Sequence, residues 1–210
     1  MDIQQTLLDA PLIAILRGLD PGRAIDTAGT LLDAGFRIIE VPLNSPSPIL
    51  SIEKIAHRFG DAALIGAGTV LSKEDVVSVQ AAGGSVIVSP NMDPSVGETS
   101  VSRGLLWFPG VMTPSEAFSA LAYGASVLKL FPAELIPPKA VAAMRAVLPN
   151  EAKVAAVGGI RPEDMISYRM AGCDAFGLGS ALFKPDYSLE DIGARAKRFV
   201  FEASKLRDCR

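Results

Sequence analysis

Three charged residues lie inside short apolar segments of the sequence: Arg17 in LIAILR, Glu40 in FRIIEVPL and Lys129 in SVLKLF. A buried lysine loses its proton more easily than an exposed one, because burial disfavours the ammonium form and lowers its pKa. The uncharged amine attacks carbonyl carbons, and a nearby carboxyl group can transfer the protons. These residue types predict Schiff-base chemistry, with Lys129 as the nucleophile and Glu40 as the proton shuttle.

An alternative for this pair is a buried Lys-Glu ion pair made only for packing. Such pairs often cost as much in desolvation as they return in Coulomb energy. A purely structural pair predicts no covalent adduct, whereas an imine-forming lysine predicts one.

Two further residues could hold the carboxylate of a substrate. Arg17, in AILRG, can present a bidentate fork of N–H donors. Thr69 closes LIGAGT, where two glycines let a ligand approach the backbone and the hydroxyl can bind a carboxylate oxygen. Their structural alternatives are a strand-end arginine paired with solvent or a neighbouring acid, and a tight turn capped by threonine.

The elements that position these residues follow a regular alternation of short β-branched apolar runs and longer amphipathic segments. This pattern is typical of βα units whose parallel sheet is covered on both faces. Capping residues, Pro or acids at the helix starts and Gly at the ends indicate short turns. The runs predicted as strands cover residues 12–17, 36–43, 64–69, 85–90, 105–110, 126–131, 153–158 and 175–180.

Eight βα units within 210 residues predict an α/β fold: a single (β/α)₈ TIM barrel domain over residues 1–210. A short N-terminal helix near residues 2–9 is expected to plug the bottom of the barrel. A doubly wound open sheet is the competing architecture, but its usual GxGxxG turn is replaced here by RGLDPGR. In a barrel, catalytic groups stand at the C-terminal strand ends, where Glu40 and Lys129 would meet in the lumen.

Glycine-rich turns follow the last two predicted strands and read VGGIRPED and GLGSALF. Barrels frequently hold phosphate at these turns, with backbone N–H groups directed at it. The predicted phosphate-binding residues are Gly158, Gly159, Gly179 and Ser180.

Composition excludes several other classes of protein. The net charge of -3 leaves no basic stripe for nucleic acid and no polybasic segment for an anionic membrane. The sequence contains no stretch of about 18 apolar residues that could cross a bilayer, and its first residues lack the charge pattern of a signal peptide. A cytoplasmic location is therefore expected.

The residues that most often form covalent or metal sites are few. Cys173 and Cys209 are too few for a disulfide framework or a thiolate metal site. His57, in a charged helical stretch, is expected to face solvent.

The motifs resemble those of 2-dehydro-3-deoxy-6-phosphogalactonate aldolases, within the wider family of 2-keto-3-deoxy-6-phosphogluconate aldolases. The resemblance runs in order from residue 12 to about residue 182. The segments that carry it are AILRG, IIEVPLNSP, LIGAGTV, VSPN, LKLFP, AVGGI and GLGS.

This resemblance implies a role for each candidate residue. Lys129 would be the Schiff-base lysine, Glu40 the general acid and base, and Arg17 and Thr69 the carboxylate-binding residues. The phosphate would bind at Gly158, Gly159, Gly179 and Ser180. The family also implies a homotrimer, a small phosphorylated 2-keto-3-deoxy sugar acid as substrate, and no metal or other cofactor.

The reaction implied is cleavage of 2-dehydro-3-deoxy-6-phosphogalactonate to pyruvate and D-glyceraldehyde 3-phosphate. Asn44 stands where the gluconate-specific group often has arginine, and Val157 where it has threonine, which favours the galactonate epimer. Three alternatives stay open: the gluconate epimer as main substrate, a phosphate-binding barrel isomerase or synthase without a covalent step, and a barrel that only binds its ligand.

Overall fold

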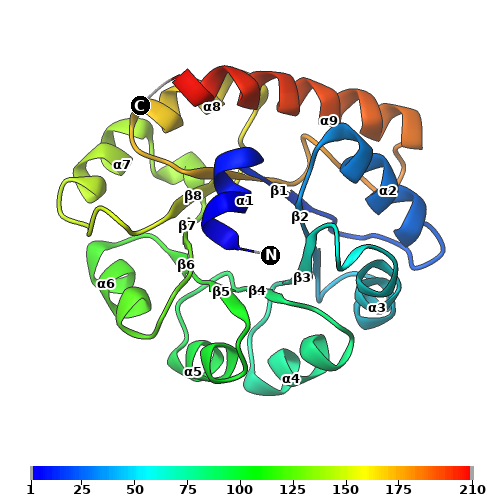
Figure 1. Cartoon of the computed structure of the whole chain (residues 1–210). Helices are drawn as coiled ribbons and strands as arrows, with labels where there is room; N and C mark the ends of the chain where they lie inside the picture. The colour runs from blue at the N-terminus through cyan, green and yellow to red at the C-terminus, as the bar shows by residue number, and fades with distance from the viewer. Residues whose placement is uncertain (1, 209–210) are drawn as a thin grey trace.

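The sheet of this protein curls into a barrel surrounded by helices, as the computed structural model shows for residues 2–208 (Figure 1). The described residues form nine parallel strands in the order β5-β4-β3-β2-β1-β9-β8-β7-β6. The prediction of a (β/α)₈ barrel is therefore confirmed. The strands are β1 Leu12–Ile15, β2 Ile38–Pro42, β3 Leu64–Gly68, β4 Val86–Val88, β5 Leu106–Phe108, β6 Gly110–Val111, β7 Leu128–Leu130, β8 Val154–Val157 and β9 Ala175–Leu178.

Helices follow the strands and cover the outside of the sheet (Figure 1). The α-helices are α1 Ile3–Asp9, α2 Ala24–Ala34, α3 Pro48–Phe59, α4 Lys73–Ala81, α5 Pro94–Ser102, α6 Pro114–Ala122, α7 Pro138–Arg145, α8 Met165–Met170 and α9 Leu189–Ser204. Short 3-10 helices are η1 Ala133–Leu135, η2 Pro162–Asp164 and η3 Lys205–Asp208. None of the helices within residues 2–208 is long and apolar enough to cross a membrane.

Predicted helix starts are confirmed where the sequence offers a side-chain cap. Ser72 begins α4 with a capping box to Asp75, and Thr113 begins α6 with one to Glu116. In each box the cap hydroxyl accepts from a backbone N–H of the first turn while the carboxylate accepts from the cap residue's own N–H. These reciprocal bonds fix where the chain turns from loop to helix.

The fifth predicted strand, residues 105–110, is wrong as one continuous element, because the structure divides it at Pro109 into β5 and β6. Proline has no N–H to donate to a ladder, so regular pairing stops there. The two pieces still close the barrel. The Phe108 carbonyl accepts from Ser89 N beyond β4 at 3.1 Å, and the Pro109 carbonyl accepts from Lys129 N on β7 at 3.0 Å.

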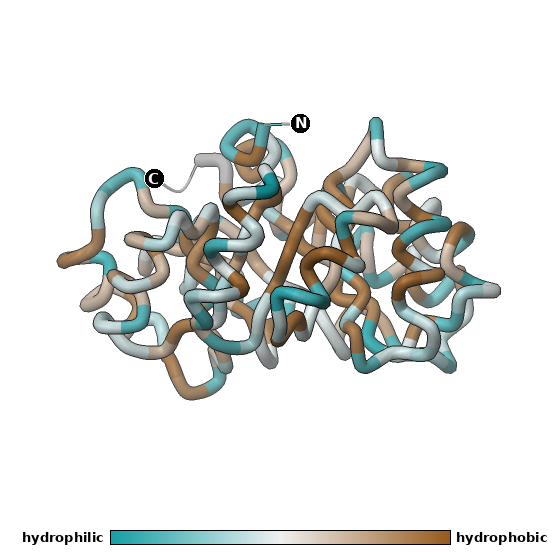
Figure 2. The backbone as a smooth tube through the Cα atoms, turned by 90° about the horizontal axis from the view of Figure 1, so that it is seen from below, coloured by the Kyte–Doolittle hydropathy of each residue, from teal (hydrophilic) through white to brown (hydrophobic). Residues whose placement is uncertain are grey.

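The barrel lumen is filled by apolar side chains that alternate with outward-facing ones along the strands. Helix α1 lies across one end of this lumen (Figure 1) and stands out from the barrel in the perpendicular view (Figure 2). Its Leu7 belongs to the buried lumen cluster, which confirms the predicted plug. The cluster comprises Leu7, Ile13, Ile15, Ile38, Leu64, Val86, Val88, Phe108, Val127, Ala155, Val157 and Ala175.

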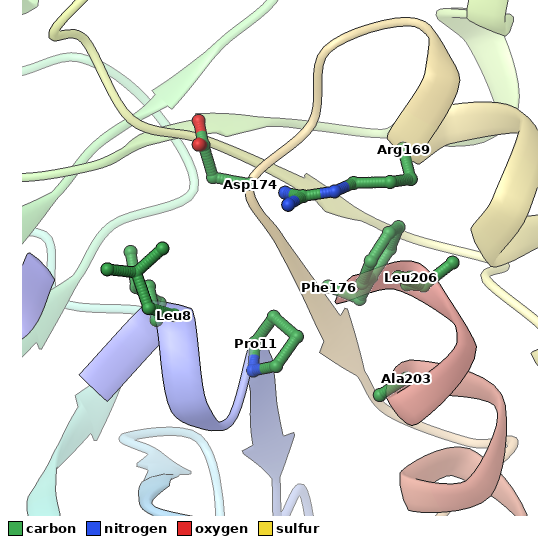
Figure 3. Close-up of a pocket in the computed structure, with 8 residues that line it drawn as sticks. Leu8, Pro11, Arg169, Asp174, Phe176, Ala203 and Leu206 are labelled. Carbon is green, nitrogen blue, oxygen red and sulfur yellow. The ribbon is translucent and has the colours of Figure 1, made fainter. Parts of the chain in front are cut away.

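A small hollow of about 250 Å³ lies beside the plug, at the N-terminal ends of the strands. Leu8 and Pro11 form one wall and Phe176 and Leu206 another, while Arg169 reaches across it (Figure 3). The Arg169 guanidinium donates to the Cys173 carbonyl at 3.2 Å. The hollow is therefore part of the packing between α1, α8 and the C-terminal helices.

The plug gives a direct test of this packing. Leu7 is only 5% exposed, whereas its neighbour Leu8 is 45% exposed. Leu7→Ala is expected to lower the free energy of unfolding by about 2–5 kcal/mol, because it leaves a cavity in the lumen core. Leu8→Ala, the matched control, should change it by no more than about 0.5 kcal/mol. Urea denaturation measures both values, and equal effects would contradict the plug.

Candidate active site

All the residues predicted for the site line one cleft of about 1070 Å³ at the C-terminal ends of the strands. The strands end before several of these residues, so Arg17, Thr69 and Ser180 lie in the connecting loops rather than in the predicted strands. The structure therefore brings together side chains from both halves of the sequence. The predicted residues in the cleft are Arg17, Glu40, Thr69, Lys129, Gly158, Gly159, Gly179 and Ser180.

Lys129 stands on β7 and is only 7% exposed. Its Nζ donates to the Ser89 carbonyl oxygen at 3.3 Å and lies 4.6 Å from the centre of the Phe131 ring. Burial lowers the pKa of this amine because the ammonium form loses water; Glu40 opposes the shift and Arg17 adds to it. Lys129 thus has the surroundings of a nucleophilic amine.

Glu40 stands on β2 and is 2% exposed. Burial raises the pKa of its carboxyl from 4.5 to about 7, against the attraction of Lys129 and Arg17. Its Oε2 is buried and has no hydrogen-bond partner among the described residues. A carboxyl group with a pKa near neutrality can both accept and donate a proton, which suits general acid and base catalysis.

Glycine at position 68 makes room for Glu40. A Cβ atom placed on Gly68 would lie 2.0 Å from Glu40 Oε2, far inside contact distance. Gly68 is the last residue of β3, in register with Pro42 of β2. The GAG segment therefore lets the carboxyl group lie against the backbone of the neighbouring strand.

Arg17 follows β1 and is tied to the loop after β2. Its Nη1 donates to Asn44 Oδ1 at 2.5 Å, and the backbone N–H of Gly18 donates to Ser45 Oγ at 2.9 Å. One edge of the guanidinium is engaged by Asn44, and a guanidinium carries further N–H donors on its other edges. These two bonds set the direction in which Arg17 can meet an anion.

Thr69 takes an unusual backbone conformation directly after β3. Its φ is 56°, in the left-handed region that β-branched residues seldom adopt. Strained residues of this kind persist only where the surrounding structure enforces them, and they cluster at ligand sites. The half-buried Thr69 lines the cleft beyond Glu40.

The two glycine-rich turns lie together at one end of the cleft. Gly158 and Gly159, after β8, have φ values of 110° and 67°. Glycine adopts such positive φ values without strain, and the absence of side chains lets a ligand approach the backbone N–H groups of the turn. Gly179 and Ser180 follow β9 on the neighbouring strand, so the pair of turns forms one polar wall.

Sequence reasoning missed two cations in this wall, Arg161 and Lys184. Both are exposed, and each follows a quoted glycine turn within a few residues. The signal was present in the segments VGGIRPED and GLGSALFK, but surface cations are too common for their position alone to identify them. Together they add positive charge next to the turns.

The remaining chemistry-bearing residues stay outside this cleft. His57 is exposed in the last turn of α3, as predicted. Cys173 is buried, and burial raises the pKa of its thiol to about 12, while Cys209 lies outside the described residues. Within the described part of the chain, His, Cys, Asp and Glu side chains form no cluster of three or more suited to a metal ion.

The fold and the site define a barrel with a buried amine and a carboxyl group of near-neutral pKa in one cleft, beside two glycine-rich turns. The family model described as KDPG and KHG aldolase matches residues 3–194. The chain belongs to this aldolase family, whose members are Schiff-base, class I lyases.

The chain is similar to two named aldolases and to one solved structure. The chain is 46% identical over 189 residues to the probable 2-dehydro-3-deoxy-6-phosphogalactonate aldolase of Rhizobium meliloti (strain 1021), covering 90% of this chain and 89% of that protein. It is 45% identical over 190 residues to the 2-dehydro-3-deoxy-6-phosphogalactonate aldolase of Escherichia coli (strain K12), covering 90% and 93%. A solved structure described as "Native KDPGal structure" superimposes with a TM-score of 0.92 at 43% identity, covering 93% of this chain and 95% of that chain.

The raised pKa of Glu40 predicts a pH-dependent stability. Because the folded-state pKa of about 7 exceeds the ordinary 4.5, the folded protein favours the protonated acid and loses stability as pH rises between these values. Glu40→Gln is neutral throughout and escapes this loss. The unfolding free energy of the variant, relative to wild type, should increase from pH 4.5 to pH 7 by on the order of 3 kcal/mol.

Glu116→Gln is the control with the opposite sign. Hydrogen bonds from Met112 and Thr113 hold the pKa of Glu116 below 4.5, so its stabilising effect is present above that pH and lost as pH falls. Urea denaturation from below pH 4.5, where the Glu116 effect is lost, up to pH 8 gives both comparisons. A pH-independent difference between Glu40→Gln and wild type would contradict the assigned burial of the Glu40 charge.

Proposed function

We propose that this aldolase cleaves 2-dehydro-3-deoxy-6-phospho-D-galactonate to pyruvate and D-glyceraldehyde 3-phosphate through an imine on Lys129. The observation that carries the proposal is the pairing of a buried amine of lowered pKa with a carboxyl group whose pKa is about 7, in one cleft. One group supplies the nucleophile and the other exchanges protons at neutral pH.

The reaction begins with the uncharged amine of Lys129, which attacks the C2 carbonyl carbon. Uptake of a proton from protonated Glu40 and loss of water then give an iminium ion and leave Glu40 as the carboxylate. Glu40, as the carboxylate, takes the proton of the C4 hydroxyl, directly or through a water. The C3–C4 bond breaks, its electrons flow to the iminium nitrogen, and the aldehyde product leaves. Protonated Glu40 returns a proton to C3 of the enamine, and water hydrolyses the imine to release pyruvate and the amine.

The substrate is held by its two anionic ends. Arg17 and Thr69, which both line the cleft, bind the carboxylate beside the C2 carbon. The phosphate binds the backbone of Gly158, Gly159, Gly179 and Ser180. Arg161 and Lys184 line this same end and add favourable charge.

Preference for the galactonate epimer rests on the names of the two similar proteins and on Val157. Val157 is buried in the lumen cluster and lines the cleft, where a threonine would present a hydroxyl. A site that lacks this donor no longer favours the epimer whose hydroxyl it would bind. Assays of both C4 epimers test the preference, and faster cleavage of the gluconate epimer would reverse it.

The proposed assembly is a homotrimer, in which each chain contributes one catalytic domain. Large apolar side chains remain exposed on the described surface, including Met112 at 43% and Phe118 at 46%, and association would cover such groups. We place the enzyme in the cytoplasm, because a sugar acid phosphate, with an anionic group at each end, does not cross a membrane unaided and must be cleaved where it is made.

The imine is tested by incubation with pyruvate and borohydride, followed by mass spectrometry. Wild-type protein should gain a reduced adduct on Lys129, and Lys129→Ala should lose both the adduct and turnover. Lys184→Ala, which removes another lysine of the cleft, is the control and should keep the adduct. An adduct in Lys129→Ala would assign the imine to another lysine. The absence of an adduct in wild type would overturn the covalent mechanism in favour of a barrel that binds its ligand without an imine.

Glu40→Gln separates proton transfer from imine formation. Because the amide cannot accept a proton, turnover should fall about 10²- to 10⁴-fold, whereas the pyruvate adduct on Lys129 should still form. Steady-state cleavage and adduct yield are measured on the same preparation. Turnover equal to that of wild type would remove Glu40 from the mechanism.

A further inference from the structure

Ser89 is a fully buried polar residue that the mechanism above does not use. It follows β4 in the segment VSPN, and each of its polar groups is engaged. The N–H donates to the Phe108 carbonyl at 3.1 Å, Oγ accepts from Trp107 Nε1 at 3.4 Å, and the carbonyl oxygen accepts from Lys129 Nζ at 3.3 Å. One residue therefore links the amine of the site to the indole of a buried tryptophan.

The segment that joins β5 to β6 lies between the two partners. The carbonyls of Phe108 and Pro109 point to opposite neighbours, as consecutive carbonyls of a strand do: the first accepts from Ser89 N and the second from Lys129 N at 3.0 Å. Ser89 and Lys129 thus dock on opposite sides of the same short segment. Close approach continues at Gly110, where a Cβ atom would lie 2.1 Å from the Pro90 carbonyl oxygen.

Few other contacts restrain the amine. A lysine side chain has a flexible four-carbon stem. Among the described residues, no carboxylate oxygen lies within 4.0 Å of Lys129 Nζ, so the amine forms no ion pair. The Phe131 ring contacts the amine through its face, which does not fix the direction of an N–H bond. The charged groups that act on the amine are Glu40 on β2, which favours its ammonium form, and Arg17 after β1, which disfavours it. The Ser89 carbonyl is the directional contact.

We propose that Ser89 is a positioning residue, whose carbonyl aims the Lys129 amine into the cleft and whose hydroxyl, held by the Trp107 indole, fixes that carbonyl. The inference rests on the proposed function of Lys129. It assigns a role to the buried serine and to the indole N–H. Trp107 acts only through Ser89, because its ring lies in the outer core cluster behind the barrel wall.

The test is the rate of borohydride-trappable pyruvate imine formation as a function of pH. Ser89→Ala should lower the high-pH plateau roughly three- to tenfold, because the amine is less well aimed. The pH midpoint should move down by about half a unit, because the ammonium form loses a firmly held acceptor. Trp107→Phe removes the same hydrogen bond from the other side and should act in the same direction.

Ser100→Ala is the matched control. Ser100 is also a fully buried serine, but its hydroxyl donates to the Val96 carbonyl within α5 at 2.7 Å, away from Lys129. This variant should keep the wild-type plateau and midpoint once the folded fraction is matched.

The double variant Ser89→Ala/Trp107→Phe should be no slower than the slower single variant, because one hydrogen bond is lost in each case. A wild-type plateau and midpoint in Ser89→Ala would overturn the proposal, and so would equal effects of Ser89→Ala and Ser100→Ala. If Ser89→Ala does not fold, Trp107→Phe decides by the same criteria. If wild-type protein forms no adduct on Lys129, the proposed function itself is refuted. If the adduct forms at the same rate in wild type and in Ser89→Ala, only the role of Ser89 is refuted.

Discussion

The burial of an amine and a carboxyl group in the same barrel mouth is the constraint on which this protein depends. Removing water pushes Lys129 toward its uncharged form and Glu40 toward its protonated form. Their mutual attraction opposes both shifts but is smaller than the desolvation in each case. Both shifts favour the proposed imine chemistry, in which Lys129 is the nucleophile and Glu40 exchanges protons.

The rest of the fold makes that burial possible and keeps it local. Gly68 leaves space for the Glu40 carboxyl group, and the Ser89 carbonyl accepts from the Lys129 amine. The lumen beneath is apolar and is closed at its far end by Leu7 of α1. The packing that closes the barrel therefore lies at the N-terminal strand ends and the cleft at the C-terminal ends. The effects of substitutions on stability and on activity can for this reason be interpreted separately at the two ends.

Much of this arrangement was predictable from residue types and spacing. Apolar runs at regular intervals predicted the barrel, and Lys129 and Glu40 stood out because charge is rare in such runs. The break at Pro109 was not predicted, since LLWFPG does not reveal that the chain rejoins the sheet beside β7. The contacts of the Ser89 carbonyl and of Asn44 with Arg17 also escaped prediction, because backbone acceptors and exposed amides leave no mark in residue type. Arg161 and Lys184 resemble any surface cation until the turns place them in the cleft.

The protonation state of Lys129 in the resting enzyme tests the account most directly. NMR titration of the protein carrying ¹³C-labelled lysine, with the Lys129 signal identified by its loss in Lys129→Ala, reports the midpoint for this one amine. The account predicts a midpoint for Lys129 below the ordinary 10.5. A midpoint at or above 10.5 would show that Lys129 is held as an ammonium ion, and an imine-forming role would be contradicted.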